Sequence, residues 1–298
     1  MKTVLKVLSL RSRATHLVSA IATSWMLLFA GASTAAPITN LFIFGDSLSD
    51  SGALNVLAPG ACPPLPYSGC RFSNGPVWAE NVAASLGVSA VTAYGGGTNF
   101  AIGGQRSDQV RFGQVPLFGT SVGGIADPDA LYVVWAGGND FLQNDPGEGT
   151  IYDPLDAADN IINSVLELAA LGANDFLVAN LPILDPWAFT FNGALAAGLA
   201  GIGGGLDIIQ FDMLGLFGSI LSDPASFGLT NVTDPCLDGL SLCANPDEYL
   251  LWDAVHPTAA GHRLISDAAL ALLPGHPVPV PATLAMLLLG FAALGWSR

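Results

Sequence analysis

Short apolar runs that end at a glycine or at polar residues recur along the chain. The clearest are residues 41–44, 131–135 and 176–179. A run of this length, without alternation of apolar and polar residues, is typical of a strand that is covered on both faces of a sheet. The pattern therefore predicts buried strands at these three places.

Helical patterns separate the runs. Residues 155–171 carry apolar side chains at helical spacing, and Gly172 follows where a helix would end. The predicted apolar stripe consists of Ile161, Ile162, Val165, Leu166 and Leu168. Alternating strands and helices predict a parallel sheet with helices on both faces. Ligands bind beyond the carboxyl ends of the strands in such a sheet, so the polar residues after each apolar run are the candidates for chemistry.

Residues 1–36 have the features of a secretory signal peptide. The segment begins with basic residues, continues with an apolar run at 17–30 and closes with small residues at 31–36. We expect cleavage near Ala35 or Ala36, and an uncleaved membrane anchor is the alternative. The mature chain is expected to be secreted or held at the cell surface.

Residues 274–298 form a second segment that is unlike the body. A proline-rich spacer precedes an apolar stretch at 282–296 and a terminal Ser297-Arg298. This arrangement resembles the PEP-CTERM sorting tail of Gram-negative bacteria, although Val280 stands where that pattern has Glu. The resemblance implies recognition by an exosortase-like sorting machinery and transient membrane anchoring; a retained anchor or a buried terminal helix is the alternative. Residues 37–273 contain no linker-like stretch, which predicts one domain.

Charge excludes several classes of protein. The chain has 24 acidic residues against nine Lys and Arg, with a net charge of −15, and beyond the basic start its only cations are Arg71, Arg106, Arg111, Arg263 and Arg298. Neutralising phosphates takes clustered cations, so nucleic acid is not an expected partner. No lysine follows Lys6, which also excludes a P-loop lysine, a Schiff-base lysine and a Ser-Lys dyad.

The four cysteines fall into two close pairs, Cys62 with Cys70 and Cys236 with Cys243. Export permits disulfides, and local pairing is the simplest of the three possible connectivities. A metal site is disfavoured because neither spacing is Cys-x-x-Cys. We interpret the pairs as disulfides that close two loops.

Ser47 follows the first apolar run, in the segment Gly45-Asp46-Ser47-Leu48. If a helix begins near Leu48, free backbone N–H groups and the helix dipole at Ser47 can stabilise an oxyanion. The alternative is that Ser47 only caps that helix.

Two glycine-containing segments could complete an oxyanion site. Asn139 follows the run 131–135 and could donate an N–H, and Gly137 and Gly138 permit close backbone approach. Residues 99–104 offer further glycine N–H groups. Either segment could equally be a simple turn.

A serine nucleophile needs a base, and the body holds two histidines, His256 and His262. Asp253 lies three residues before His256. Pro257 is expected to begin a helix that continues over residues 258–273. An Asp that orients a His, which in turn deprotonates a Ser, is the acyl-transfer triad. His262 lies within the expected helix, where a packing role is favoured over the role of base.

Together these segments resemble the ordered blocks of the GDSL, or SGNH, hydrolase family; the matching blocks are 45–48, 99–104, 137–140 and 253–257. The resemblance implies a three-layer α/β/α sandwich with a flavodoxin-like parallel sheet. It also implies a triad of Ser47, Asp253 and His256, with an oxyanion hole formed by the Ser47 backbone N–H, Gly104 and Asn139, and Gly103 is the alternative to Gly104. The implied mechanism uses no cofactor and no metal.

Residues 181–224 further resemble the lipase and phospholipase-like branch of that family. Their apolar side chains could form an acyl-binding lid or groove, although an ordinary core helix is favoured because apolar pairs recur at helical spacing from Met213 to Leu221. Gly201 to Gly205 are interpreted as a flexible connection. The leading hypothesis is a secreted serine ester hydrolase. A carbohydrate O-deacetylase acting on surface polysaccharide and a non-catalytic surface or matrix protein are the alternatives.

Overall fold

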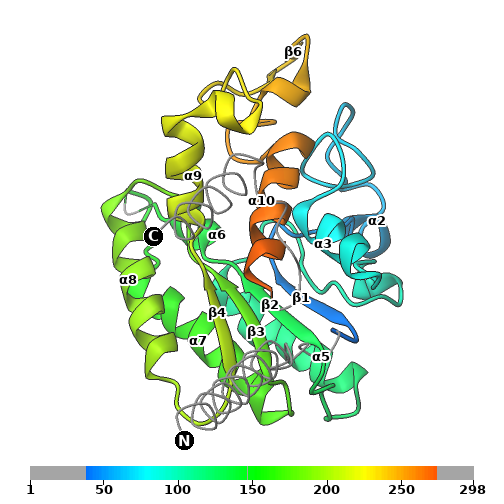
Figure 1. The fold of residues 1–298 in the computed structure, drawn as a ribbon, viewed down its shortest axis with the longest axis vertical. Coiled ribbons are helices and arrows are strands. Elements are labelled where there is room, and N and C mark those ends of the chain that lie inside the picture. The colour runs from blue at the N-terminus through cyan, green and yellow to red at the C-terminus, as the bar shows by residue number, and fades with distance from the viewer. Residues whose placement is uncertain (1–37, 146, 274–298) are drawn as a thin grey trace, which may run out of the picture. The chain divides into compact units, whose positions relative to one another are not determined.

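A four-stranded parallel sheet forms the centre of the protein in a computed structural model, which describes residues 38–145 and 147–273. The strand order is β1 (Leu41–Gly45), β2 (Leu131–Trp135), β3 (Asp175–Ala179) and β4 (Asp207–Phe211), shown in Figure 1. All neighbouring strands run parallel. The three apolar runs are thus strands, as predicted, and β4 was not predicted.

Side chains of the strands alternate between two cores, one on each face of the sheet. Phe42, Tyr132 and Phe176 belong to one core, whereas their neighbours Leu41 and Leu131 belong to the other. Helices cover both faces of β1, β2 and β3, so these three strands are buried on both sides. This explains why their sequences are continuous apolar runs.

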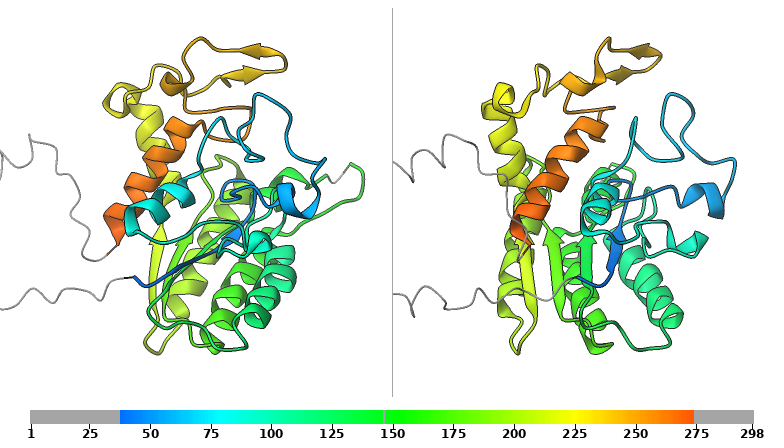
Figure 2. Two further views of the ribbon diagram at one scale, coloured as in Figure 1. Left: turned by 90° about the vertical axis from the view of Figure 1, so that its right-hand side faces the viewer. Right: turned by 45° about the vertical axis from the view of Figure 1, so that its right-hand side comes forward.

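Helices form the two outer layers. One core includes side chains of α5 (Val115–Ser121), α7 (Pro154–Ala170) and α8 (Pro186–Gly201), and the other includes side chains of α3 (Trp78–Leu86) and α10 (Ala259–Leu272). The two further views show these layers on opposite sides of the sheet (Figure 2). The structure therefore confirms the predicted three-layer α/β/α sandwich.

Two predicted helices are present, each with a local correction. Helix α7 matches the predicted range 155–171 within one residue, but Leu166 is 42% exposed and lies outside the buried stripe. Helix α10 matches the range 258–273, but Pro257 is not its first residue. Thr258 caps the helix instead, since its side chain accepts a hydrogen bond from the Gly261 amide.

The apolar segment after β3 is more complex than one core helix. It forms α8, then β4, then α9 (Met213–Ser222), and Gly201 to Gly205 connect α8 to β4. The helical spacing from Met213 to Leu221 is confirmed in α9. Phe191 and Leu195 of α8 are buried in the core, so this part of the segment packs against the sheet.

Short helices and one hairpin complete the described chain. The helical elements are α2 (Leu54–Leu57), η1 (Ala93–Gly95), α4 (Ser107–Gln109), η2 (Val110–Gln114), α6 (Gly138–Leu142), η3 (Pro224–Phe227) and η4 (Pro246–Glu248). The antiparallel hairpin pairs β5 (Leu237–Asp238) with β6 (Ser241–Leu242). Within residues 38–145 and 147–273, none of the helices has both the length and the apolarity needed to cross a membrane.

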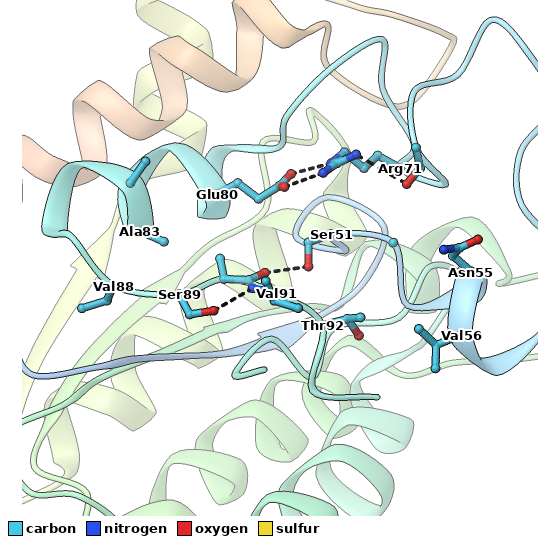
Figure 3. Close-up of a pocket in the computed structure, with 14 residues that line it drawn as sticks. Ser51, Asn55, Val56, Arg71, Glu80, Ala83, Val88, Ser89, Val91 and Thr92 are labelled. Carbon is cyan, nitrogen blue, oxygen red and sulfur yellow. Dashed lines mark hydrogen bonds and ion pairs between the residues drawn. The ribbon is translucent and has the colours of Figure 1, made fainter. Parts of the chain in front are cut away.

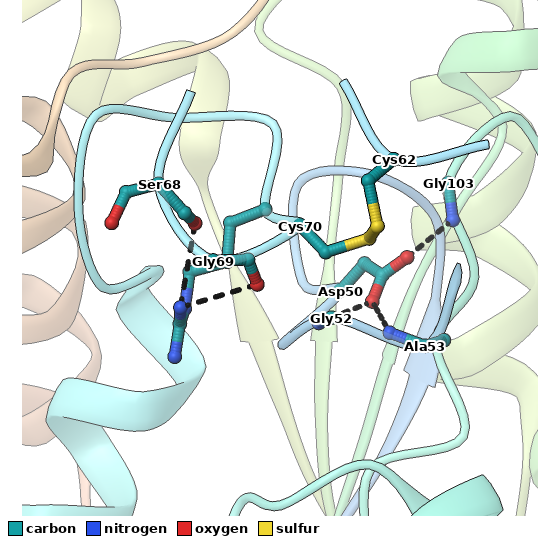
Figure 4. Close-up of a disulfide and its surroundings, with 9 residues drawn as sticks. Asp50, Gly52, Ala53, Cys62, Ser68, Gly69, Cys70 and Gly103 are labelled. Atoms are coloured by element: carbon teal, nitrogen blue, oxygen red, sulfur yellow. Dashed lines mark hydrogen bonds between the residues drawn. A yellow bond between two sulfur atoms is a disulfide. The ribbon is translucent and has the colours of Figure 1, made fainter. Parts of the chain in front are cut away.

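Both predicted cysteine pairs are disulfides in the structure. Cys62 is bonded to Cys70, and Cys236 to Cys243. The first disulfide closes a loop that lies over the segment following β1 (Figure 4). The second closes the β5–β6 hairpin.

The carboxyl end of β1 is held by a buried glutamine. The Gly45 amide donates to Gln114 Oε1 at 2.9 Å, and Gln114 Nε2 donates to the Gly45 carbonyl at 2.7 Å. Gln114 is only 1% exposed. Beside it, the Ile102 amide also donates to the Gly45 carbonyl, at 3.2 Å. Gln114 therefore replaces a neighbouring strand at the point where the chain leaves the sheet towards Ser47.

Replacing Gln114 by Met should lower the free energy of unfolding by about 2 kcal/mol, because the buried Gly45 amide then has no partner. Urea denaturation measures this loss. Gln210→Met is the matched control, since Gln210 is exposed on β4 and its side chain makes only a 3.4 Å bond to the Ala196 carbonyl. Equal stabilities of the two variants would contradict the role given to Gln114.

Candidate active site

Ser47 lies in a tight turn at the carboxyl end of β1. The Leu48 amide donates to Asp46 Oδ1 at 3.0 Å, and the Ser49 amide donates to the Asp46 carbonyl at 3.1 Å. No helix begins near Leu48, which corrects the sequence prediction; the first helix of this segment is α2. The side chain of Asp46 offers the backbone a partner that competes with helical hydrogen bonds. The helix dipole therefore contributes nothing at Ser47.

Asp50 fixes the rest of this segment. Its buried carboxylate accepts hydrogen bonds from the Gly52, Ala53 and Gly103 amides at 2.8, 2.6 and 2.8 Å (Figure 4). Burial raises the pKa of Asp50, against the opposing effect of these amide bonds. The carboxylate thus ties the segment after Ser47 to the segment that contains Gly104.

Ser47, His256 and Asp253 form a continuous chain of hydrogen bonds. Ser47 Oγ lies 2.9 Å from His256 Nε2, and His256 Nδ1 lies 2.8 and 2.9 Å from the two oxygens of Asp253. The Ser47 residue is 8% exposed. The structure therefore brings together the three residues that the sequence suggested for a triad.

The loop that carries Asp253 and His256 is rigidly held. Asp253 Oδ1 accepts from the Val255 and His256 amides, each at 2.8 Å, and the Trp252 amide donates to the His256 carbonyl at 2.7 Å. This turn explains the three-residue spacing, because the carboxylate folds back onto the backbone and then meets the imidazole.

Two further bonds fasten this loop to the segment before α3. Ser73 Oγ donates to the Pro257 carbonyl at 2.9 Å, and the Ala259 amide donates to Asn74 Oδ1 at 2.7 Å. The ring of Phe72 lies 5.2 Å from the ring of His256. Phe72 therefore packs beside the imidazole.

The environment of Asp253 favours its charged form. Burial alone would raise the pKa of Asp253, but the hydrogen bonds and charge of His256, with the hydrogen bond from Tyr67, outweigh it and lower the pKa to about 2. Tyr67 Oη donates to Asp253 Oδ2 at 2.7 Å. Asp253 is thus suited to orient His256 and to stabilise a positive charge on its ring.

His262 has no part in this chain of hydrogen bonds. It lies on α10, is 1% exposed, and burial followed by the charge of His256 lowers its pKa to about 3. His262 is therefore a neutral core residue.

The backbone N–H groups of Ser47 and Gly104 have no hydrogen-bond partner among the described residues. The Gly103 amide, by contrast, donates to Asp50 at 2.8 Å. This difference favours Gly104 over Gly103 as an oxyanion donor. Gly104 has a φ of +80°, a backbone conformation that residues with a Cβ rarely adopt.

Asn139 lies at the start of α6, beside the same two amides. One hydrogen of its Nδ2 group is used in a 3.0 Å bond to the Gln105 carbonyl. An amide nitrogen carries two hydrogens, so one remains for a second acceptor. Burial raises the pKa of Asp46, and a hydrogen bond from the Asn139 side chain opposes this shift. Asp46 and a ligand at Ser47 would lie in the same pocket as this group.

Ser47, Gly104, Asn139 and His256 line a common pocket of about 170 Å³. Its other walls are Asp46, Gly138 and four apolar side chains, Leu48, Phe72, Leu142 and Val255. A reactive hydroxyl, an imidazole base and free N–H donors around one small cavity can together perform acyl transfer.

The pKa of Asp46 is raised, whereas that of Asp253 is lowered. Burial raises the pKa of Asp46 to about 6, although the bond from the Leu48 amide and the charge of His256 oppose the shift. Asp46 is 2% exposed. Sequence reasoning missed the positioning roles of Asp46, Asp50, Gln114 and Tyr67, and only the Asp-x-Leu turn signal at Asp46 was available to find one of them.

The sequence of residues 41–269 matches the family described as GDSL-like Lipase/Acylhydrolase. The chain belongs to this family. It is 29% identical to Esterase EstA of Pseudomonas aeruginosa, over 80% of this chain and 47% of that protein, so it spans about half the length of EstA.

Two other similar proteins cover a comparable share of the chain. The Phosphatidylcholine-sterol acyltransferase of Aeromonas hydrophila is 25% identical, over 78% of this chain and 89% of that protein. A crystal structure of a member of the lipolytic protein G-D-S-L family from Veillonella parvula is 18% identical, covers 78% of this chain and 97% of that one, and has a TM-score of 0.46.

The raised pKa of Asp46 makes the stability depend on pH. A carboxyl group with a pKa of about 6 in the folded protein and 3.8 unfolded stabilises the fold fully below pH 3.8, and this contribution is lost as the pH rises through 6. Asp46 alone should therefore make the free energy of unfolding about 2 kcal/mol lower at pH 7.5 than at pH 4.5. The lowered pKa of His262 acts in the opposite direction in this window, and the raised pKa values of Asp50, Asp140 and Asp175 act in the same direction, so the contribution of Asp46 is measured by comparison with a variant. Asp253 contributes no slope in this window, because its contribution is lost only as the pH falls from 3.8 towards 2.

Urea denaturation at both pH values measures this contribution: the change in free energy of unfolding from pH 4.5 to pH 7.5 should be about 2 kcal/mol more positive in Asp46→Asn than in the wild type. Asp159→Asn, at an exposed position of α7, should behave as the wild type. An Asp46→Asn variant with the pH dependence of the wild type would contradict the assignment.

Proposed function

We propose that the protein is a serine ester hydrolase that forms an acyl-enzyme on Ser47. The observation that carries this proposal is the hydrogen-bonded chain of Ser47, His256 and Asp253. It lies in one pocket with the Ser47 and Gly104 amides, which have no partner in the part of the chain that the structure describes. Membership of the lipase and acylhydrolase family supports an ester as the substrate.

In the proposed reaction, Ser47 Oγ attacks the carbonyl carbon of the ester, and its proton passes to His256 Nε2. Asp253 accepts the Nδ1–H of His256 and stabilises the imidazolium that forms. The N–H groups of Ser47, Gly104 and Asn139 stabilise the oxyanion. When the tetrahedral intermediate collapses, His256 returns the proton to the departing alcohol; a water molecule then releases the acid by the same steps.

The size of the pocket supports a short acyl group. Its volume of about 170 Å³ is below the ~300–1,000 Å³ typical of pockets that enclose drug-sized ligands. Leu48, Phe72, Leu142 and Val255 provide apolar contacts for such a group. The same volume also suits an acetyl group, so a carbohydrate O-deacetylase is the second candidate.

We further propose that this domain, residues 37–273, acts outside the cytoplasm. The two disulfides support this location, since such bonds persist in oxidising compartments. The predicted signal peptide at 1–36 and the predicted PEP-CTERM-like tail at 274–298 lie outside the described residues and stay predictions.

Ser47→Ala and His256→Ala should each lower kcat for a nitrophenyl ester by at least about 1,000-fold, because the triad acts as one unit. His262→Gln is the matched control and should keep activity within a few-fold. Circular dichroism of all three variants establishes that they are folded. A folded Ser47→Ala variant that retains activity would contradict the proposal, and a folded wild type without activity on any ester would favour a non-catalytic surface protein.

Chain length provides a separate test. Among nitrophenyl acetate, butyrate, octanoate and palmitate, we expect the highest kcat/KM for acetate or butyrate, because longer chains extend beyond the pocket. Leu142→Ala should move the optimum towards longer chains by widening one wall. A maximum at palmitate in the wild type would show that another apolar surface binds the acyl chain.

A further inference from the structure

The disulfide-closed loop of residues 62–70 reaches the triad. Tyr67 lies in this loop, and its hydroxyl donates a 2.7 Å hydrogen bond to Asp253 Oδ2 across a sequence separation of 186 residues. The ring of Tyr67 also packs edge-on against Trp252, at 5.9 Å between centroids. The family motifs identified in the sequence do not include this residue.

The bond from Tyr67 completes the hydrogen bonding of the Asp253 carboxylate. Oδ1 accepts from the Val255 and His256 amides, whereas Oδ2 accepts from Tyr67 and also lies 2.8 Å from His256 Nδ1. The backbone amides hold only Oδ1, so Tyr67 is the contact outside His256 that fixes the position of Oδ2. Loss of the hydroxyl would leave Oδ2 with His256 as its single partner among the described residues.

Tyr67 remains a donor across the working pH range. Burial, with the hydrogen bond to Asp253 and the charge of that carboxylate, raises the pKa of the Tyr67 hydroxyl well above its ordinary value. The phenol therefore keeps its proton, and Asp253 remains the acceptor.

The loop that presents Tyr67 is closed and braced. Besides the Cys62–Cys70 disulfide, the Tyr67 amide donates to the Pro64 carbonyl at 3.1 Å, and the Ser68 amide donates to the Ser73 carbonyl at 2.9 Å. Directly after the loop, Arg71 forms a two-pronged ion pair with Glu80 of α3, which Figure 3 shows at the edge of a surface pocket. These contacts fix the backbone on either side of Tyr67.

We propose that Tyr67 is a positioning residue for ester hydrolysis: it holds Asp253 so that His256 stays directed at Ser47. The Cys62–Cys70 disulfide maintains the loop conformation that places the Tyr67 hydroxyl against Asp253. This inference rests on the proposed function for its catalytic consequence, but the contact between Tyr67 and Asp253 can be tested without a substrate.

Tyr67→Phe in the full-length protein removes only the hydroxyl. We expect kcat for nitrophenyl butyrate to fall about tenfold with KM within twofold, because Tyr67 does not line the pocket at Ser47 and the loss acts through His256. Tyr132→Phe is the matched control. It removes a hydroxyl that donates to the Asp127 carbonyl at 2.8 Å near the amino end of β2, whereas Ser47 follows the carboxyl end of β1, and it should leave kcat and KM within twofold.

Proton NMR gives a readout that is independent of turnover. The Nδ1 proton shared by His256 and Asp253 should give a downfield resonance that shifts or broadens in Tyr67→Phe and is unchanged in Tyr132→Phe. If the wild type hydrolyses no ester, the proposed function fails, yet this resonance still decides the role of Tyr67. An unchanged resonance in Tyr67→Phe, or an unchanged kcat in an active enzyme, would overturn the inference.

The role of the disulfide is tested by a double-mutant cycle. Removing it with Cys62→Ala and Cys70→Ala should lower kcat to about the level of Tyr67→Phe, and should cause no more than a twofold further loss when Tyr67 is already Phe. If the fold losses in kcat from removing the disulfide and from Tyr67→Phe multiply in the combined variant, the disulfide does not act through Tyr67. An unchanged kcat in the variant without the disulfide would lead to the same conclusion.

Discussion

The hydrogen bond between Ser47 Oγ and His256 Nε2 joins positions that are 209 residues apart in the chain. A hydroxyl and an imidazole at 2.9 Å can transfer a proton only if both backbones are fixed within a fraction of an ångström. On one side, Gln114 holds the end of β1 through both polar groups of Gly45. On the other, Ser73 and Asn74 hold the backbone on both sides of Thr258. The apolar cores on the two faces of the sheet provide the rigid frame for these contacts.

Several of the acidic residues of this protein are buried. Asp46, Asp50 and Asp140 are buried, and each accepts hydrogen bonds from backbone amides. These carboxylates hold turns, which explains how a chain with few cations can bury so many acids. Asp46 precedes Ser47 and Asp253 contacts His256, and their pKa values are shifted in opposite directions, to about 6 and about 2. Below pH 6 the site therefore keeps its negative charge at Asp253, and Asp46 becomes charged as the pH rises above 6.

The sequence predicted the parts of the fold that depend on local pattern. The buried strands β1, β2 and β3 and the helices α7 and α10 follow from apolar runs and helical spacing. Strand β4 was missed because it lies at an edge of the sheet, and its sequence mixes exposed polar residues with partly buried isoleucines. The helix expected after Ser47 is absent because the Asp46 side chain and the Asp50 carboxylate capture amides that a helix would use. Short sequence motifs contain Ser47, Asp253 and His256 and made them predictable. The partners Gln114 and Tyr67 lie 69 and 186 residues from the groups they contact. No local pattern indicates such contacts.

The central claim is that Ser47 is a nucleophile activated by His256. Intact-mass and peptide-mass measurements after treatment with a fluorophosphonate test it most directly, because this reagent forms a stable covalent bond with an activated serine and does not depend on knowing the natural ester. The account predicts a single adduct on the peptide that contains Ser47, none in Ser47→Ala, and a much slower reaction in His256→Ala. A folded protein that takes up no label, or that takes it up at another residue, would contradict the account.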